Sequence, residues 1–400
     1  MSGATPAKLA SVGLVTTLGD SLEENWSRLV AGDQSRFSQR TDLIPGETRL
    51  FGEVREELPE IPAELAPYRC RNNQLALAAL GPIRDALEAA LGNFGGHRVG
   101  VVVGSSTGGM AQAEAALRVR ASEGQMPARF DLAQLEFGGL SEFIAQVSGA
   151  AGPCYAISSA CSSGAKALVS ARSLLELDLC DAVIAGAVDS LCALTANGFF
   201  GLQALSKNLT NPMSRERDGL TLGEGAALFL MTRETGGVQL LGCGESSDAH
   251  HMSAPEPGGR GVETCMRAAL RDADLDASEI AYLNLHGTGT SQNDATESAA
   301  VSRVFGPETP CSSTKPLVGH TLGASGAIEA AFCWLLLARR QGGDLLLPPH
   351  RFDGRIDSDL PPLALTREAT QVSAPPPAAV MTNSFGFGGS NCSLVIGEAS

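Results

Sequence analysis

Lysine, tyrosine and tryptophan are scarce in this chain of 400 residues, which contains four, three and two of them. Acidic residues outnumber basic ones by 44 to 29, and the formal net charge is −15 at pH 7. This balance argues against binding to nucleic acid or to an anionic membrane surface. It would also repel an acidic protein partner unless basic residues cluster locally. Three groups could form such a cluster: Arg69 with Arg71, Arg118 with Arg120, and Lys207 with Arg215 and Arg217.

Long hydrophobic runs are missing as well. No stretch approaches the roughly 20 apolar residues that a helix needs to cross a bilayer. The first eight residues show no basic segment followed by a long apolar run, so we expect no signal peptide. The ten cysteines form no C-x-x-C pair, and most of them lie in apolar runs. This pattern is typical of reduced, buried thiols in a cytoplasmic protein, and it predicts no metal site.

Apolar strand-like runs alternate with helical patterns along the whole chain, which predicts an α/β fold with a mostly parallel, helix-covered sheet. The first half has expected strands at 9–15, 99–103, 154–158, 182–188 and 226–231, and expected helices at 72–91 and 161–177. The second half has expected strands at 238–244, 280–285, 379–382 and 392–396, and expected helices at 262–274 and 324–340. This common order of elements predicts two similar halves, residues 1–236 and 237–400, although no sequence repeat is obvious.

Cys161 is the cysteine with the most reactive setting. A strand-like run at 153–157 stops at small residues, and a helical pattern begins at or just after Cys161. Unpaired N–H groups and the macrodipole at a helix N-terminus favour a thiolate. The small residues at 162–164 would let a bulky acyl group approach. A buried structural cysteine is the alternative that this stretch alone leaves open.

Two histidines of the second half are each followed by small, glycine-rich residues. His286 begins the stretch HGTGT directly after a strand-like run, and His320 lies in GHTLGASG at the start of the expected helix 324–340. Junctions between strands and helices are where open α/β sheets build their sites. A neutral imidazole there can donate a hydrogen bond to a developing oxyanion. The other histidines have no comparable setting and are expected to be structural or surface residues: His97, His250, His251 and His350.

A third stretch of interest, TNSFGFGGSN, covers residues 382–391. The three glycines around Phe387 favour a tight turn whose backbone N–H groups point outward, as an oxyanion site requires. A β-turn with an aromatic lid on the core is the alternative that the stretch alone leaves open.

Together these stretches resemble the thiolase-fold condensing enzymes, and specifically the elongating β-ketoacyl-(acyl carrier protein) synthases. That family has a TACSSG-like turn, then HGTGT, KxxxGHTxGASG and NSFGFGGxN. This chain has SACSSG, HGTGT, KPLVGHTLGASG and NSFGFGGSN in the same order. The resemblance covers the whole chain. It implies a thiolase-like fold of two pseudo-duplicated halves in a layered α-β-α-β-α arrangement, and a decarboxylative Claisen condensation of an acyl thioester with malonyl carrier protein.

The resemblance also implies the catalytic roles. Cys161 would take the acyl chain from the carrier protein. His286 and His320 would bind the malonyl thioester carbonyl and promote decarboxylation, because two hydrogen-bond donors stabilise the enolate that loss of CO₂ leaves. The backbone N–H groups of Cys161 and Phe387 would form a second oxyanion hole. The Phe387 side chain would be a gate that moves to admit the acyl chain.

Four further residues match family positions that support the catalytic ones. Lys315 matches a structural lysine, and Glu329 lies on the following helix where the family has the carboxylate partner of that lysine. Asp294 and Glu297 match an acidic pair that orders the site after HGTGT.

The remaining matches concern substrate binding. Thr288 and Thr290 match hydroxyls that hydrogen-bond the phosphopantetheine arm, which arrives on the carrier protein, so the enzyme needs no cofactor of its own. Thr107, Phe200 and Phe385 would contact the acyl chain. The starter and the length of that chain depend on the shape of the pocket.

Departures from related families narrow the subclass. The glycine-rich turn lacks the second active-site cysteine of degradative thiolases, and His320 stands where initiating synthases have asparagine. Thr107 and Ser214 differ from the residues usual in fatty acid elongation, and the chain is similar to ketosynthases of aryl polyene and related type II polyketide clusters. Chain-length-factor subunits lack the nucleophilic cysteine, which this chain retains as Cys161. A non-catalytic chain-length-factor-like partner subunit is the alternative function, and a cysteine hydrolase is a third.

The resemblance implies two protein partners. One is an acyl carrier protein. The other is a second subunit, because the fold normally dimerises through an edge strand. A homodimer and a heterodimer with a chain-length-factor-like subunit both fit the sequence.

Overall fold

The computed structural model describes residues 6–340 and 342–398, and its main sheet has the strand order β12-β10-β9-β14-β15-β8-β1-β7-β6-β4-β5. The strands of this sheet are β1 (Ala7–Val15), β4 (Val99–Gly104), β5 (Cys154–Ile157), β6 (Ala182–Asp189), β7 (Gly225–Thr232), β8 (Val238–Ser247), β9 (Ile280–Asn284), β10 (Pro310–Ser312), β12 (Ala364–Leu365), β14 (Ala379–Gly386) and β15 (Ser390–Glu398). Two short pairs lie outside it: β2 (Ser38–Arg40) with β3 (Arg49–Phe51), and β11 (Asp344–Leu346) with β13 (Gln371–Ser373).

One order of strands occurs twice in this sheet. The order β1-β7-β6-β4-β5 of the first half is repeated as β8-β15-β14-β9-β10 in the second half. The two halves join where β1 pairs with β8, through Ala7 with Leu240 and Lys8 with Gln239. The duplication that the sequence analysis predicted is therefore confirmed. The boundary that we propose, between residues 236 and 237, lies in the loop from β7 to β8.

The sheet is mixed, which corrects the expectation of a mostly parallel one. The strands next to β4 and β9 are parallel to them, whereas β7 and β15 are antiparallel to both of their neighbours. Only the short turn at residues 387–389 separates β14 from β15. A parallel pair needs a crossover of a dozen or more residues, so a turn of this length enforces an antiparallel pair.

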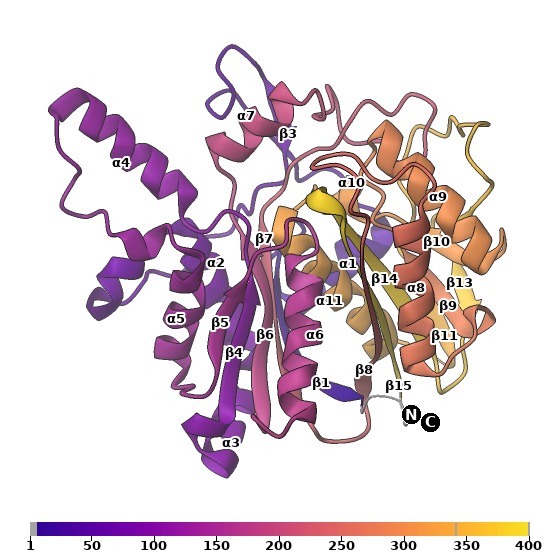
Figure 1. Ribbon diagram of the computed structural model, residues 1–400, viewed down its shortest axis with the longest axis horizontal. Coiled ribbons are helices and arrows are strands. Elements are labelled where there is room, and N and C mark those ends of the chain that lie inside the picture. The colour runs from indigo at the N-terminus through magenta and orange to yellow at the C-terminus, as the bar shows by residue number, and fades with distance from the viewer. Residues whose placement is uncertain (1–5, 341, 399–400) are drawn as a thin grey trace.

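Helices cover the outer faces of both halves and fill the layer between them (Figure 1). The helices are α1 (Leu22–Ala31), α2 (Arg71–Leu80), α3 (Arg84–Phe94), α4 (Met110–Glu123), α5 (Phe137–Ser148), α6 (Ser163–Glu176), α7 (Ala193–Gly201), α8 (Arg260–Ala273), α9 (Ser291–Phe305), α10 (Lys315–Val318) and α11 (Ser325–Ala338). α6 and α11 pack against each other and against strands of both halves, while α2 and α5 cover the first half and α8 covers the second. This is the predicted α-β-α-β-α layering.

The close packing of α6 on α11 depends on two glycines. A Cβ atom on Gly164 would lie 2.8 Å from the backbone nitrogen of Ala327, and one on Gly326 would lie 2.8 Å from that of Ala165. Both helices begin with the triplet Ser-Gly-Ala, at 163–165 and 325–327. The crossing therefore brings the starts of both helices, and the loops that precede them, together at one end of the sheet.

The expected elements are present with small shifts at their ends. The exception is the helix expected over 72–91, which is split into α2 and α3 by a short 3₁₀ turn, η2 (Gly81–Ile83), that contains Pro82. Proline lacks the N–H that a continuous helix would need there. Within the described residues no helix is both long and apolar enough to span a membrane.

Candidate active site

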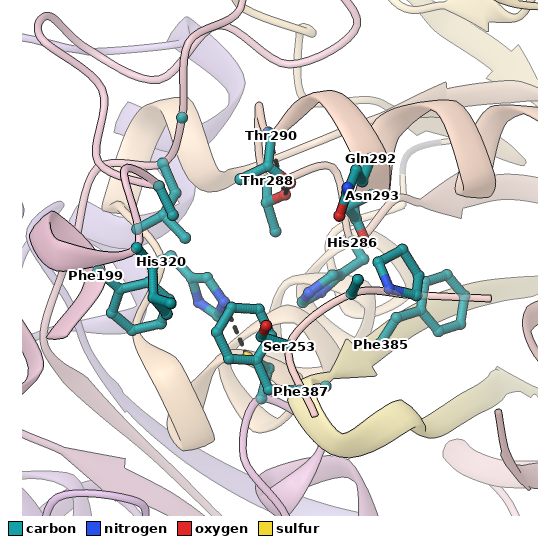
Figure 2. A pocket seen from close by; sticks show the side chains of 18 of the residues that line it. Phe199, Ser253, His286, Thr288, Thr290, Gln292, Asn293, His320, Phe385 and Phe387 are labelled. Atoms are coloured by element: carbon teal, nitrogen blue, oxygen red, sulfur yellow. Dashed lines mark hydrogen bonds between the residues drawn. The ribbon is translucent and has the colours of Figure 1, made fainter. Parts of the chain in front are cut away.

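The four motif stretches meet at a cavity of about 370 Å³ (Figure 2). Cys161 follows β5, His286 follows β9, His320 precedes α11, and Phe387 lies in the turn between β14 and β15. The predicted site residues that line the cavity are Cys161, His286, Thr288, Thr290, His320, Phe385 and Phe387.

The turn that carries Cys161 is tightly constrained. Ala160 has φ +53°, in the left-handed region that a residue with a side chain rarely adopts. The hydroxyl of Ser163 stabilises this turn, because it accepts a hydrogen bond from Ser159 N–H (2.9 Å) and donates one to the Ala160 carbonyl (2.6 Å). Gly386 packs against the same turn, where a Cβ atom would lie 3.2 Å from Cys161 N. The turn thus holds the sulfur in the cavity wall, at the start of α6.

Burial, rather than the helix start, determines the charge of the Cys161 sulfur. Burial raises the pKa of Cys161 to about 11, although the charge of Lys315 and the backbone N–H groups of Phe387 and Cys161 itself act to lower that pKa. The thiol is therefore protonated at neutral pH. This corrects the expectation that the helix N-terminus alone would favour a thiolate.

Hydrogen bonds assign the tautomers of both histidines. Nδ1 of His320 accepts the N–H of Leu322 at 3.2 Å and lies 2.9 Å from Ser325 Oγ. Nδ1 of His286 lies 3.3 Å from Nζ of Lys315, and an ammonium group can only donate. Each Nδ1 is therefore an acceptor, so the proton of each neutral ring is on Nε2.

Both rings are neutral, because burial and the nearby Lys315 charge lower the pKa of His286 and of His320 well below the ordinary value. The Nε2 atom of His320 lies 3.1 Å from Cys161 Sγ, and the two rings meet edge to face with centroids 5.4 Å apart. Two neutral N–H donors thus converge beside the sulfur.

Distance alone would also allow a metal ion at this place, since a nitrogen of each histidine and Cys161 Sγ all lie within 4.8 Å of one another. The proton on each Nε2 makes these atoms donors rather than metal ligands. The arrangement suits a developing oxyanion better than a cation. The absence of a metal stays a prediction.

A buried ion pair between Lys315 and Glu329 lies next to His286. Lys315 Nζ lies 2.6 Å from Glu329 Oε1, and both side chains are almost fully buried. Burial raises the pKa of Glu329 to about 7, while the adjacent Lys315 charge acts to lower it. The second oxygen of Glu329 has no hydrogen-bond partner in the part of the chain that the structure describes. The pair orients the lysine toward Nδ1 of His286.

Glu297 holds the backbone of the HGTGT loop. Its two oxygens accept the N–H groups of His286 and Gly287, each at 2.7 Å. Burial raises the pKa of this carboxyl to about 7, and the two N–H donors act against that rise. The carboxylate belongs to α9 and lies outside the cavity, so it fixes the loop without occupying the site.

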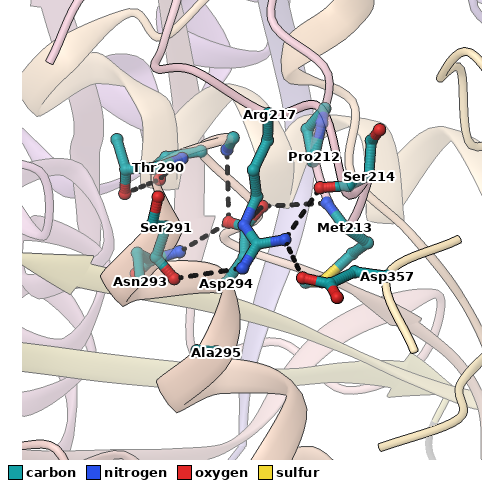
Figure 3. A network of polar contacts seen from close by, with 12 residues as sticks. Pro212, Met213, Ser214, Arg217, Thr290, Ser291, Asn293, Asp294, Ala295 and Asp357 are labelled. Carbon is teal, nitrogen blue, oxygen red and sulfur yellow. Dashed lines mark hydrogen bonds and ion pairs between the residues drawn. The ribbon is translucent and has the colours of Figure 1, made fainter. Parts of the chain in front are cut away.

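Asp294 holds the next part of the loop, within the polar network of Figure 3. It accepts the N–H groups of Met213 (2.8 Å) and Gly289 (3.2 Å), and Nε of Arg217 lies 3.9 Å away. Burial raises the pKa of Asp294. Arg217 also pairs with Asp357, so it serves the interior of the protein. Only the other two members of the candidate basic group, Lys207 and Arg215, are exposed.

The turn that carries Phe387, η7 (Phe387–Gly389), is held by a loop that the sequence analysis did not single out. Gly388 N–H donates to the Met252 carbonyl at 2.8 Å, and Asp248 N–H donates to the Gly389 carbonyl at 2.9 Å. The amide of Asn391 donates to Asp248 at 2.7 Å. These partners lie well over a hundred residues apart along the chain, so no local pattern could reveal them.

Phe387 lines the cavity, and its side chain is partly exposed. Its ring stacks at a tilt on Phe199, with centroids 5.5 Å apart (Figure 2). Cavity-lining residues without a sequence signal include Leu202, Gln203, Leu220, Ser253, Gln292 and Asn293.

Two predicted substrate-binding residues lie outside the cavity lining. Thr107 is buried, and its hydroxyl donates to the Asp189 carboxylate at 2.7 Å. Phe200 is partly exposed on α7, with the Arg49 guanidinium 5.8 Å from its ring centroid. Its neighbour Phe199 lines the cavity instead. Contact of Thr107 and Phe200 with the acyl chain stays a prediction.

Comparison with known proteins agrees with this geometry. The family model "Beta-ketoacyl synthase, N-terminal domain" matches residues 9–236, and "Beta-ketoacyl synthase, C-terminal domain" matches residues 238–343. The chain belongs to the β-ketoacyl synthase family. Its thiolase-like fold and its Cys161, His286 and His320 constellation make it an acyltransferase, a 3-oxoacyl-(acyl carrier protein) synthase. The intact constellation favours a catalytic ketosynthase over a chain-length factor.

Individual relatives extend this result. The chain is 30% identical over 415 residues to 3-oxoacyl-[acyl-carrier-protein] synthase 2 of Coxiella burnetii, with 97% of each chain covered. It is 41% identical to the ketosynthase ApeO of Xenorhabdus doucetiae, solved in complex with its chain length factor ApeC, with a TM-score of 0.93 and 99% and 98% of the two chains covered. The ishigamide ketosynthase/chain length factor is 26% identical, with a TM-score of 0.86 and 99% and 100% coverage.

Proposed function

We propose that this ketosynthase condenses an acyl chain held on Cys161 with malonyl carrier protein in a type II polyketide pathway, of the aryl polyene kind or a related one. The observation that carries the proposal is the convergence of two neutral imidazoles on the Cys161 sulfur. The 41% identity to ApeO, against 30% to the Coxiella synthase, supports a polyketide rather than a fatty acid pathway.

In the first step the acyl chain moves from the carrier to the enzyme. The sulfur of Cys161 attacks the thioester carbonyl carbon, a new C–S bond forms, and the bond to the pantetheine sulfur breaks. The backbone N–H groups of Cys161 and Phe387, which flank the sulfur, stabilise the oxyanion of the tetrahedral intermediate. The thiol proton ends on the departing pantetheine sulfur, so the transfer is neutral overall. His320 Nε2–H stabilises the negative sulfur that forms on the way.

In the second step the malonyl group loses CO₂. The bond to the carboxylate carbon breaks, its electron pair stays on the thioester, and the Nε2–H groups of His286 and His320 donate to the enolate oxygen. The enolate carbon then attacks the acyl carbonyl on Cys161. A C–C bond forms, the C–S bond to Cys161 breaks, and the Cys161 thiolate that leaves takes a proton from solvent. Lys315 keeps His286 in the donor tautomer throughout.

We further propose that the second subunit is a chain-length-factor-like protein. Two similar solved ketosynthases are described with their chain length factors. β5 is an edge strand of the sheet, and exposed strand edges are normally covered. α5 packs against β5, and three large apolar side chains are exposed on α4, on the 3₁₀ turn before α5 and at the start of α5: Leu117, Leu132 and Phe137. Such apolar surface supports a subunit interface. Co-purification with the product of a neighbouring chain-length-factor gene tests this. A stable homodimer in the presence of that gene product would contradict it.

The acyl carrier protein is the other partner that we propose, and the cytoplasm is the compartment. Lys207, Arg215 and Arg355 are exposed. The backbone N–H of Lys207 donates to Asp218, and Arg217, two residues after Arg215, donates to the carbonyl of Ser291; both acceptor residues line the cavity. The charge of the three exposed residues suits an acidic carrier, despite the net charge of −15 of the enzyme.

Replacement of Cys161 by alanine tests the reaction itself. The wild-type protein, supplied with acyl and malonyl carrier proteins, should form a β-ketoacyl thioester, and mass spectrometry should find an acyl group on Cys161. Cys161→Ala should give neither, whereas Cys243→Ser, at a cysteine of β8 outside the cavity and away from the proposed interface, should give both. Condensation by Cys161→Ala would overturn the proposal. Release of a free acid would instead indicate the cysteine hydrolase.

A further inference from the structure

The structural repeat gives the first half a region that is equivalent to the active-site region of the second half. It consists of the loop after β4, the end of β6 and the segment before α11. Ser106 lies two residues after β4, as His286 lies two residues after β9. Asp189 ends β6, as Gly386 ends β14. The paired glycines of α6 and α11 place Gly323 where the other half has Cys161.

In this region the side chains bond to one another. The Asp189 carboxylate is fully buried, and it accepts hydrogen bonds from the hydroxyls of Ser105 (2.8 Å), Ser106 (2.8 Å) and Thr107 (2.7 Å). It also accepts the backbone N–H groups of Ser106 and Thr107, each at 2.8 Å. No ion pair to Asp189 is found among residues 6–340 and 342–398. Hydrogen bonds alone compensate its burial.

One link leads from this cluster into the active site. The hydroxyl of Ser106, which donates to Asp189, also accepts the N–H of Gly323 at 3.1 Å. A Cβ atom at Gly323 would lie 2.7 Å from an Asp189 oxygen, so only glycine fits there. The preceding residue, Leu322, has φ +53° and donates its N–H to Nδ1 of His320.

We propose that Asp189 is a positioning residue for His320, acting through Ser106 and Gly323. The cluster of the first half holds the left-handed backbone at Leu322. That backbone supplies the N–H that keeps Nδ1 of His320 an acceptor and its Nε2–H directed into the cavity. The inference rests on the role proposed above for His320 in decarboxylation.

Two neighbouring serines provide a matched pair of variants. Ser106→Ala removes the link to Gly323 and leaves the bonds of Asp189 to Ser105 and Thr107. Ser105→Ala removes a bond to the same carboxylate but no contact with the segment that carries His320. Ser106→Thr keeps the hydroxyl. Asp189→Asn places an amide against N–H donors and should weaken the whole cluster.

The test measures two half-reactions of the purified enzyme with its partner subunit: release of CO₂ from malonyl carrier protein, and acylation of Cys161. We expect Ser106→Ala and Asp189→Asn to slow decarboxylation about ten- to a hundred-fold relative to acylation, since misplacement of a catalytic group by about 1 Å costs on that order. Ser105→Ala should leave the ratio of the two rates within about twofold of wild type, because acceptor bonds remain. Ser106→Thr should restore it.

Equal losses of both half-reactions in Ser106→Ala, or the same ratio in Ser105→Ala, would overturn the inference. His320→Ala separates this failure from that of the proposed function. If decarboxylation survives His320→Ala, the role of His320 fails and the inference fails with it. If His320→Ala abolishes decarboxylation but Ser106→Ala does not slow it, the inference alone fails.

Discussion

The loops after β4 and β9 are equivalent in the structural repeat, yet one is closed and the other is open. After β9, Glu297 binds the backbone from α9, outside the cavity, and leaves the side chain of His286 free to face substrate. After β4, Asp189 binds both the backbone and the hydroxyls from inside. Gly386 leaves space at the place equivalent to Asp189. The two loops therefore differ in where the carboxylate that binds them lies. Glu297 lies outside the cavity and leaves room for substrate, whereas Asp189 fills the equivalent space in the first half.

The two inner helices show the same contrast. Cys161 precedes α6, and its counterpart before α11 is Gly323. Glu329 on α11 pairs with Lys315, whereas the equivalent position on α6 is Ala167, which is buried in the hydrophobic core. Each half thus contributes what the other lacks: a nucleophile from one, and charged and hydrogen-bonding groups from the other.

Breaking the buried ion pair should have the largest effect. Lys315→Ala leaves Glu329 without a partner and should lower the free energy of unfolding by about 3–5 kcal/mol. The pKa of Glu329, already raised by burial to about 7, would rise further. Unfolding exposes this carboxyl, whose ordinary pKa is 4.5. Below about pH 7 this carboxyl is protonated in both folded proteins, so the deficit should be smaller and constant there. It should grow as the pH rises above about 7, where the wild-type carboxyl ionises beside Lys315 and the carboxyl of the variant stays protonated. Denaturant unfolding at several pH values measures this.

The matched control is a surface ion pair. Lys8 pairs with Glu234 where both side chains are partly exposed, so Lys8→Ala should cost less than about 1 kcal/mol. Adding Glu329→Gln to Lys315→Ala should recover part of the loss, because no charge is then buried. If Lys8→Ala and Lys315→Ala lowered the free energy of unfolding equally, the buried ion pair would contribute no more to stability than the surface pair.

The helix crossing gives the next largest effect. Gly326→Ala places a Cβ atom 2.8 Å from Ala165 N, so α6 and α11 must move apart, at a cost of about 1–3 kcal/mol. A Cβ atom at Gly198 of α7 would meet nothing within 4 Å among the described residues. Gly198→Ala should thus be neutral or slightly stabilising. Thermal unfolding of both variants measures the difference, and a neutral Gly326→Ala would show that the crossing of α6 and α11 does not require glycine at this position.

The sequence predicted the site far better than its surroundings. Cys161, His286, His320 and Phe387 lie in motifs whose spacing is local, and the structure brings them to one cavity. The cluster at Asp189 joins segments about eighty residues apart, and local patterns carry no trace of such pairings. The mixed sheet was missed for a similar reason, because apolar runs reveal strands but not their directions.

The protonation state of the Cys161 thiol could not be predicted from the sequence either. A helix start is visible as a pattern of small residues, but burial of the sulfur depends on the turn after β14 and on both histidines. Desolvation then outweighs the helix N-terminus.

The start of α6 provides a pH test of that balance. Burial raises the pKa of Cys161 to about 11, so its thiolate fraction, and its rate of alkylation by iodoacetamide, should rise about tenfold per pH unit between about pH 7 and pH 10. Mass spectrometry of the Cys161 peptide measures the rate, and a free small thiol treated in parallel corrects for the reagent. A rate that is flat above pH 7 would mean that the helix start, and not burial, controls the sulfur.

The smallest effect is expected at the surface, where only the open copy of the site has a mouth for a carrier protein. Arg215 and Arg355 are exposed, and both lie near Glu216; the next residue, Arg217, donates to the carbonyl of the cavity-lining Ser291. Charge reversal of Arg215 and Arg355 to glutamate should raise the KM for the carrier about three- to tenfold, leave kcat unchanged and weaken the salt dependence. Arg84→Glu, on α3 at the opposite end of the sheet (Figure 1), is the control for net charge. An equal rise in KM for Arg84→Glu would mean that overall charge, and not this mouth, attracts the carrier.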